Sequence, residues 1–237
     1  MNRKVAIVVV ATVFFIVSLP LLFAASFNEL DFSLDNERIK DRVIGNYIDC
    51  DSYVDKENKN NIDLVKWANF AYLHHWGYVY GTYGTILTDS AFEAKVNQYP
   101  DEVGSHYDFI AKNYVGIRTS DCVGLIKGYL WFDPEKSIVS YTYGNAPDVS
   151  ADGMYYAATE KGTIDTLPEI PGLAVWHHGH IGIYIGDGWV IQAANTKKGV
   201  IKTRVDAPGW NWTHWLKIPY LTYLDEEEVT NVESSSK

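Results

Sequence analysis

Cys122 is the residue of this chain whose type and position best fit a nucleophile. It follows Asp121 at the start of a predicted helix. The residues after it have the apolar spacing of one helix face: Val123, Ile126 and Leu130. Ser120 or Asp121 can cap the N–H groups of the first turn, and these groups together with the helix dipole favour a thiolate. An ordinary buried cysteine fits the same pattern, so the rest of the chain has to distinguish the two.

Two glycines interrupt this predicted helix. Gly124 and Gly128 each cost a helix about 1 kcal/mol relative to alanine, so a reason other than helix propensity must keep them there. They lie four residues apart and therefore on one side of the helix. We expect them to let the helix approach a sheet closely.

A β-hairpin is predicted further along the chain. Segments 180–185 and 189–194 flank the sequence Gly-Asp-Gly at 186–188, a typical hairpin turn. If the loop has three residues, Ile185 lies opposite Trp189 and one face of the hairpin is wholly apolar. A two-residue loop would bury an amide in that face at a cost in free energy, so we predict the three-residue loop.

With that loop, His180 and Gln192 are diagonal neighbours on the other face, and Asn195 is an alternative partner of the histidine. Thiol-dependent acyl transfer requires three groups. They are a thiolate, here at Cys122, an imidazole that takes and returns the proton, and an amide oxygen that fixes the imidazole tautomer. Backbone N–H groups at the start of the cysteine helix are natural donors to the oxyanion. We therefore expect this helix to cover the face that carries His180 and Gln192.

The composition limits the class of protein. A chain of 237 residues that is 47% hydrophobic can bury one sizeable core, and its net charge of −10 argues against binding to nucleic acid. Its two cysteines provide no disulfide framework, and Cys50 lies in the predicted linker without a nearby His or Asp arrangement in the sequence, so no role is predicted for it. His177, His178 and His180 could form a metal cluster, but on a strand His177 points away from the other two. We therefore expect no metal and no cofactor.

The N-terminus predicts export. Arg3 and Lys4 precede an uncharged run over 5–25, which is long enough to cross a bilayer. We predict a transmembrane anchor over 1–27, with a signal segment removed near Ala25 as the alternative. In both cases the remainder is extracytoplasmic, because the positive residues stay inside.

Beyond the anchor, the predicted segments are a polar linker (28–60), a single α+β domain (61–223) with an insertion at about 83–117, and a disordered acidic tail (224–237). Asn61 or Asp63 caps a first helix with an apolar stripe formed by Leu64, Trp67, Ala68 and Ala71. Further helices are predicted after a Ser90–Glu93 capping box, over 107–113 and over 154–161. Strands over 173–176, 200–205 and 212–218 extend the hairpin into an antiparallel sheet.

These motifs resemble those of the NlpC/P60 family, papain-like cysteine peptidases that cut cell-wall peptides. The segment Asp-Cys-Val-Gly-Leu at 121–125 resembles the family's Asp-Cys-Ser-Gly-Leu, and 180–186 resembles its His-Val-Gly-Ile-Tyr-Ile-Gly strand. The resemblance covers about 61–222. It implies a papain-like fold in which a nucleophile-bearing helix packs on an antiparallel sheet. It also implies hydrolysis of peptidoglycan stem peptides, next to D-γ-glutamyl residues, by Cys122, His180 and Gln192.

The resemblance also implies a substrate-binding set, and it has departures. Tyr78, in a loop similar to the family's Tyr-x-x-Gly-Gly, joins Asp121 and Val123 as expected substrate-binding residues. Val123 stands where the family has serine, Gln192 where histidine is common, and Thr82 where the loop has its second glycine. These departures leave open a degenerate member that binds wall peptide or a partner protein without cutting it.

Two further alternatives remain. The same thioester intermediate could be intercepted by an amine, which would make the protein an acyl or amide transferase. Trp210, Trp212 and Trp215 could stack on sugar rings, although packing of a final strand is the commoner role of such residues. The sequence indicates no oligomeric state.

Overall fold

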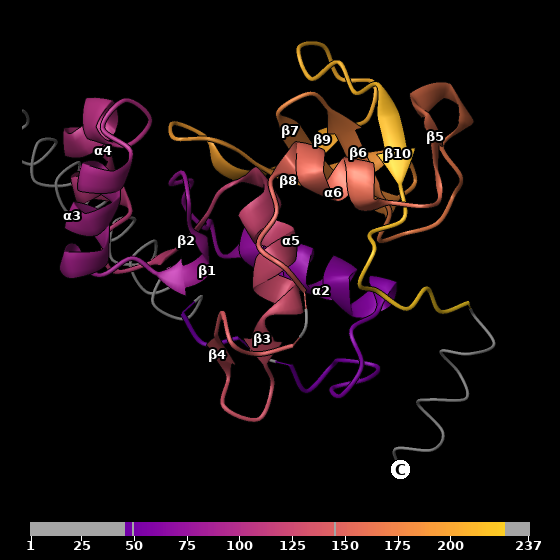
Figure 1. The fold of residues 1–237 in the computed structure, drawn as a ribbon, viewed down its shortest axis with the longest axis horizontal. Coiled ribbons are helices and arrows are strands. Elements are labelled where there is room, and N and C mark those ends of the chain that lie inside the picture. Colours follow the sequence, from indigo (N-terminus) through magenta and orange to yellow (C-terminus); the bar gives the residue numbers. More distant parts are fainter. Residues whose placement is uncertain (1–45, 49, 145, 226–237) are drawn as a thin grey trace, which may run out of the picture. The chain divides into compact units, whose positions relative to one another are not determined.

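A computed structural model describes residues 46–48, 50–144 and 146–225 of the chain (Figure 1). The predicted membrane segment, most of the predicted linker and the tail from 226 onward lie outside the described residues. Within the described part, no helix has the length and apolar character needed to cross a membrane.

The element bounds are as follows. The helices are α2 (Asn61–Leu73), α3 (Asp89–Gln98), α4 (Tyr107–Asn113), α5 (Cys122–Leu130) and α6 (Ala151–Ala157). The strands are β1 (Tyr83–Ile86), β2 (Arg118–Ser120), β3 (Phe132–Asp133), β4 (Ile138–Val139), β5 (Lys161–Thr163), β6 (Ala174–His177), β7 (His180–Gly186), β8 (Trp189–Asn195), β9 (Gly199–Arg204) and β10 (His214–Leu216).

One six-stranded antiparallel sheet, in the order β5-β10-β6-β7-β8-β9, dominates the domain, so the predicted α+β class is confirmed. Two small sheets, β1-β2 and β3-β4, were not predicted. The predicted helix over 154–161 is wrong in its bounds, because Ser150 accepts from the N–H of Gly153 and starts the helix earlier. The chain from Lys161 then pairs with β10 as an edge strand.

The β7–β8 hairpin corrects the predicted turn. Gly186 pairs with Trp189, which leaves a two-residue loop of Asp187 and Gly188, both with positive φ (52° and 71°) as a tight primed turn requires. A bulge at Ile185 absorbs the extra residue. Beyond the bulge the predicted pairing holds, because the bulge restores the register in which the isoleucines share one face; the observed pairs are Ile183–Ile191 and Tyr184–Val190.

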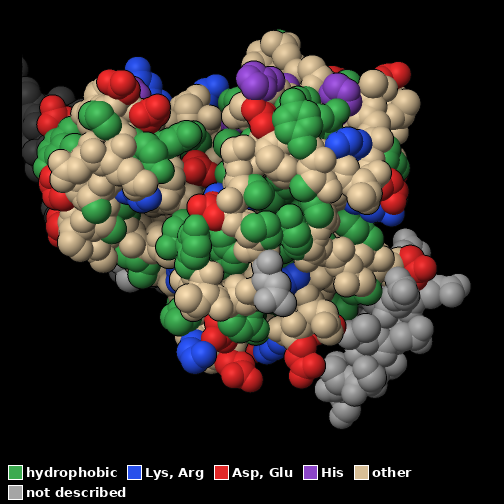
Figure 2. All heavy atoms as spheres, in the orientation of Figure 1, with side chains coloured by type: hydrophobic (Ala, Val, Ile, Leu, Met, Phe, Trp, Pro, Cys, Tyr) green, Lys and Arg blue, Asp and Glu red, His purple; other side chains and the backbone are tan. Residues whose placement is uncertain are grey.

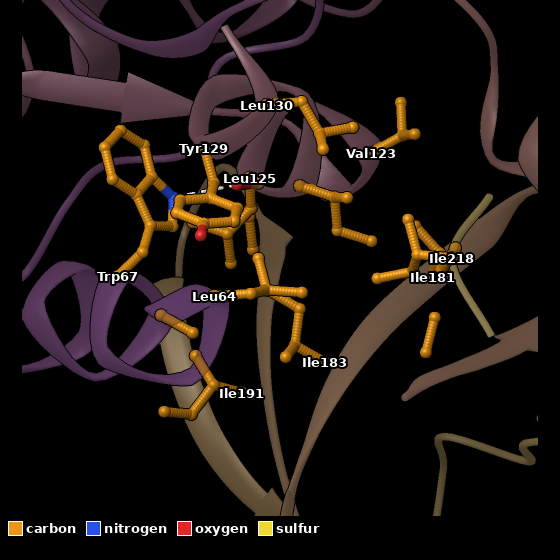
Figure 3. Packing of buried hydrophobic residues seen from close by; sticks show 14 of the residues in the cluster. Leu64, Trp67, Val123, Leu125, Tyr129, Leu130, Ile181, Ile183, Ile191 and Ile218 are labelled. Carbon is orange, nitrogen blue, oxygen red and sulfur yellow. Dashed lines mark hydrogen bonds between the residues drawn. The ribbon is translucent and has the colours of Figure 1, made fainter. Parts of the chain in front are cut away.

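Helices α2 and α5 pack against the isoleucine face of the sheet (Figure 3). In Figure 3, side chains from both helices point toward those of β7 and β8, including Leu64, Leu125, Ile183 and Ile191. The Trp67 indole N–H donates to the backbone oxygen of Leu125 (2.8 Å) and links the two helices inside this core. The predicted apolar stripe of the first helix is buried, which confirms its orientation.

The cap of α2 and the linker before it differ from prediction. Asn60, rather than Asn61 or Asp63, caps the helix, and it accepts from the N–H of Asp63. The buried Asp63 carboxylate in turn accepts from the N–H groups of Val54 and Asp55. These bonds tie the chain before α2 to the domain, so its described part, 46–48 and 50–60, is held against the domain. Its apolar side chains, among them Cys50, join the main core.

The insertion forms its own small core next to β1 and β2 (Figure 1). The predicted helix over 107–113 is confirmed as α4. Helix α3 is capped by Thr88, which accepts from the N–H of Ala91, so the predicted Ser90–Glu93 capping box is wrong. The Glu93 carboxylate accepts instead from the hydroxyl of Tyr107 (2.6 Å), and this bond joins α3 to α4.

Candidate active site

Asp121 is the cap of the cysteine helix and also fastens the preceding loop to it. One carboxylate oxygen accepts from the N–H of Gly124 (2.6 Å) and the other from the N–H of Gly81 (2.8 Å). Burial raises the pKa of this carboxyl, whereas the two backbone donors and the Lys127 ammonium oppose that rise. Asp121 is therefore the capping residue of the two that the sequence allowed, and it is bound to protein donors on both oxygens.

The two glycines of α5 permit a close approach to β1, which belongs to the small sheet and not to the six-stranded one. A Cβ atom on Gly124 would lie 2.0 Å from the backbone oxygen of Thr82, and one on Gly128 would lie 2.3 Å from that of Tyr83. Neither position can hold a side chain unless the backbones separate. The expectation of a close sheet contact is confirmed, with β1 and the loop before it as the partner.

Cys122 lies at the first position of α5 and is partly buried. Burial raises the pKa of its thiol to about 12, and the neighbouring Asp121 carboxylate raises it further, although N–H groups of Val123, Ile181 and Cys122 itself favour the thiolate. Burial therefore opposes the thiolate that the helix start is expected to favour.

His180 is bound to Gln192. Its Nε2 lies 2.7 Å from the Gln192 amide oxygen, and the amide nitrogen of Gln192 donates to the hydroxyl of Thr203 (3.1 Å). Because the amide nitrogen is used by Thr203, the oxygen accepts from the imidazole, which leaves Nδ1 with a free lone pair. The pair predicted from the hairpin register is thus brought together, and Gln192 rather than Asn195 is the partner.

Aromatic rings enclose His180. Trp212 and Trp210 stack on it with centroid separations of 5.4 and 6.0 Å, and His177 lies at 5.4 Å. Burial lowers the pKa of His180, the bond to Gln192 raises it, and His177 lowers it again. Of the three tryptophans considered for sugar stacking, Trp212 and Trp215 are buried and pack in the second apolar cluster of the sheet. Trp212 and Trp215 are therefore packing residues in and just before the last strand, β10.

The relation between the helix and the histidine differs from prediction. Side chains alternate along β7, so His180 and Gln192 share a face with Trp212, whereas α5 covers the face of Ile181. The helix does not cover the His180 face. It meets β7 near the strand's first residues, because the backbone N–H of Ile181, directly after His180, favours the Cys122 thiolate and so lies close to the sulfur. The start of β7, where His180 stands, therefore lies near the first turn of α5.

A cleft of about 640 Å³ opens beside Cys122. Lys95 and Tyr99 of the insertion line one side of it, and Ser150 and Asp152 at the start of α6 line another. The face of the domain in Figure 2 carries acidic and basic side chains among apolar ones. The cleft gives a peptide access to the sulfur and combines both signs of charge.

The expected substrate-binding residues lie around the sulfur. Asp121 and Val123 line the cleft, although most of the Val123 side chain is buried in the main core. Tyr78 is partly buried, and burial, with the nearby Cys122 and Asp121, raises the pKa of its phenol. Tyr78 therefore lies near the sulfur, while Tyr80 of the same loop lines the cleft.

The three histidines do not converge on a common point. His178 lies 3.0 Å from an oxygen of Asp152, His177 Nδ1 lies 3.0 Å from a backbone oxygen, and His180 is held by Gln192. Over 46–48, 50–144 and 146–225, no three His, Cys, Asp or Glu side chains are placed to hold a metal ion.

Sequence reasoning did not identify several residues that shape the site. The backbone N–H of Ile181 favours the Cys122 thiolate, and no residue type in the sequence indicates such a backbone group. Asp152 accepts from the indole of Trp176 (3.0 Å) and the N–H of Gly179 (2.7 Å), and so fixes the turn before His180. The sequence feature that could have identified Asp152 is the helix N-terminus after Ser150, but the helix was predicted to begin only at residue 154. Lys95 lies on a helix with no motif.

Comparison with known proteins returned matches to solved structures. No family model and no curated protein matches the chain. NlpC1 from Trichomonas vaginalis is 14% identical, with a TM-score of 0.38 over 67% of this chain and 45% of that one. The P60 domain of an antigen from M. avium subspecies paratuberculosis is 18% identical, with a TM-score of 0.37 over 67% of this chain and 97% of that one.

The peptidoglycan hydrolase RipB from Mycobacterium tuberculosis is 17% identical, with a TM-score of 0.35 over 67% of this chain and 66% of that one. The chain spans about half the length of the two Trichomonas structures that it matches. NlpC/P60 structures are thus among the solved structures to which this chain is similar.

Proposed function

We propose that the protein is an extracytoplasmic thiol hydrolase that cuts peptidoglycan stem peptides next to D-γ-glutamyl residues. The observation that carries the proposal is the bond between His180 and Gln192, which fixes the histidine tautomer, on a strand whose next residue, Ile181, has an N–H that favours the Cys122 thiolate. The resemblance of 121–125 and 180–186 to NlpC/P60 motifs supplies the substrate class. The domain covers about 61–223, behind the anchor predicted over 1–27.

The reaction follows from these groups. The thiol proton of Cys122 passes to Nδ1 of His180 as the sulfur attacks the scissile carbonyl, and the N–H groups at the start of α5 stabilise the oxyanion. The imidazolium returns its proton to the leaving amine, and a thioester remains on Cys122. Water, deprotonated by His180, then hydrolyses the thioester and regenerates the thiol. Gln192 holds the ring in place throughout.

A digest of purified stem-peptide fragments by the full chain tests the proposal. Mass spectrometry should detect a pair of products that together differ from the substrate by one water, and Cys122→Ala should abolish them. Cys50→Ala is the matched control, because Cys50 lies in the main core and not in the cleft, and it should keep the activity. Turnover that persists in Cys122→Ala would contradict the proposal, and an amine-capped product would indicate transfer instead of hydrolysis.

A second candidate function is binding of wall peptide without cleavage. It is favoured by the burial that raises the pKa of Cys122 and lowers that of His180, and by the apolar Val123 beside the sulfur. A peptide that binds the wild-type chain and Cys122→Ala equally well, with no product after long incubation, would support this alternative.

A further inference from the structure

The insertion contributes a lysine, Lys95, to the cleft, and its ammonium has N–H donors available for a further hydrogen bond. Lys95, on α3, lines the cleft that also contains Cys122. In the described part of the chain its ammonium bonds to the amide oxygen of Gln98 (3.0 Å) and lies over the ring of Tyr99 (5.3 Å), and it takes part in no ion pair. An ammonium has three N–H donors, so Lys95 can bind a further acceptor.

The position of Lys95 is set by its contacts with the loop before α5. A Cβ atom on Gly81 would lie 3.1 Å from the Lys95 ammonium and 2.6 Å from the ring of Tyr99, so both side chains rest on the backbone of this loop. The ring of Tyr99 also packs edge to face on Tyr80 (4.9 Å). The same Gly81 donates its N–H to Asp121, the residue before Cys122. One glycine thus separates the Lys95 ammonium from the cap of the cysteine helix.

The other charged groups of the cleft are already satisfied. Lys127 is paired with Asp148 (2.5 Å), Asp121 accepts from two backbone N–H groups, and Asp152 accepts from an indole and a backbone N–H. Lys95 is therefore the cleft cation within the described residues that makes no ion pair, although the carboxylates of Asp121 and Asp148 attract it from further away. A substrate that enters the cleft with a negative charge gains most by placing that charge at Lys95.

We propose that Lys95 forms a carboxylate-binding subsite, contributed by the insertion, that selects substrates with a free carboxylate beside the scissile bond. This inference rests on the proposed hydrolysis next to D-γ-glutamyl residues. A γ-linked glutamyl residue keeps its α-carboxylate free, a few bonds from the carbonyl that the sulfur attacks. Conversion of that carboxylate to an amide removes the charge and leaves the scissile bond unchanged.

Two synthetic stem peptides that differ only in this carboxylate or carboxamide test the subsite on the full chain. Wild type should cleave the acid about tenfold more efficiently than the amide, with the difference mainly in KM. Lys95→Gln should lose about tenfold in kcat/KM for the acid and less than twofold for the amide, and Lys95→Arg should keep part of the preference. Lys112→Gln is the control, because Lys112 is an exposed lysine of α4 that does not line the cleft.

The outcomes separate this inference from the proposed function. Equal turnover of the two peptides by wild type, or equal losses for both in Lys95→Gln, would refute the subsite and leave the hydrolase proposal intact. If wild type cuts neither peptide, the hydrolase proposal fails, and calorimetric binding of the same pair decides the subsite. A binding preference for the acid that Lys95→Gln abolishes would support it, and equal binding would refute it.

Discussion

Replacement of Gly124 by alanine tests how closely α5 is held to the loop before it. The new Cβ would lie 2.0 Å from the backbone oxygen of Thr82 and 2.8 Å from a carboxylate oxygen of Asp121. Ordinary contact begins near 3.4 Å, so the two backbones must separate by about 1.4 Å (3.4 − 2.0) at this point. The contacted atoms belong to a backbone and to a capping carboxylate, neither of which can rotate away.

The expected cost follows from three contributions. Overpacking costs about 1–3 kcal/mol, and disruption of the Asp121 cap costs about 1 kcal/mol. The higher helix propensity of alanine returns about 1 kcal/mol. We therefore expect Gly124→Ala to lower the free energy of unfolding by about 2 kcal/mol. For a domain of this size that corresponds to a fall in Tm of roughly 4–8 °C.

Thermal and urea unfolding of the full chain, followed by circular dichroism, measure this change. Gly153→Ala in α6 is the matched control, because its Cβ would meet only side-chain atoms, the nearest at 3.2 Å. That variant should be within about 0.5 kcal/mol of wild type or slightly more stable. If Gly124→Ala melts at or above the wild-type temperature, the close packing of α5 on Thr82 is wrong.

Three further predictions concern the titrating groups. Alkylation of Cys122 by iodoacetamide should accelerate about tenfold per pH unit from pH 7 to 10, because burial raises the thiol pKa to about 12; a plateau near neutral pH would instead indicate a preformed thiolate. Burial lowers the pKa of His180 below its ordinary 6.5, so the unfolded chain binds more protons and stability should fall as pH drops below about 6.5. His180→Leu should weaken that dependence in urea titrations, and an unchanged slope would contradict it. Gln192→Leu should lower kcat about 100-fold, whereas Gln192→Glu should move the acid limb of the pH–rate profile to higher pH; an unmoved limb would argue against the bond between the two side chains.

The sequence predicted the pairing of His180 with Gln192 because burial decides a strand register: a slip of one residue would place the Gln192 amide among the isoleucines. It misjudged the turn, since the choice between a three-residue loop and a two-residue loop with a bulge depends on backbone angles at Gly186 and Asp187. It also misjudged the cap of α2, where Asn60, Asn61 and Asp63 are all suitable cap types. When neighbouring residues have equal preference for the N-cap position, only tertiary contacts decide which of them caps the helix.

The layer of the site could not be predicted for a different reason. The alternation of residues along a strand shows which side chains share a face of the sheet. A helix packs on the face that is wholly apolar, and α5 therefore contacts Ile181 and Ile183. The expectation that α5 covers the His180 face was wrong, because the helix packs on the isoleucine face and only its first turn lies near the start of β7. The position of Lys95 was equally hidden, since it depends on how the insertion folds back onto Gly81.

The charges of the site connect the fold to the proposed chemistry. Burial opposes ionisation of both Cys122 and His180. In the proposed reaction, the thiol proton moves to His180 as the sulfur attacks the peptide. The N–H groups of Cys122, Val123 and Ile181 favour the thiolate and offset part of the desolvation cost of that step. The aromatic rings around His180 and the apolar Val123 add to that cost, so the proposed mechanism requires the bound peptide to supply a carbonyl for attack as the charges form.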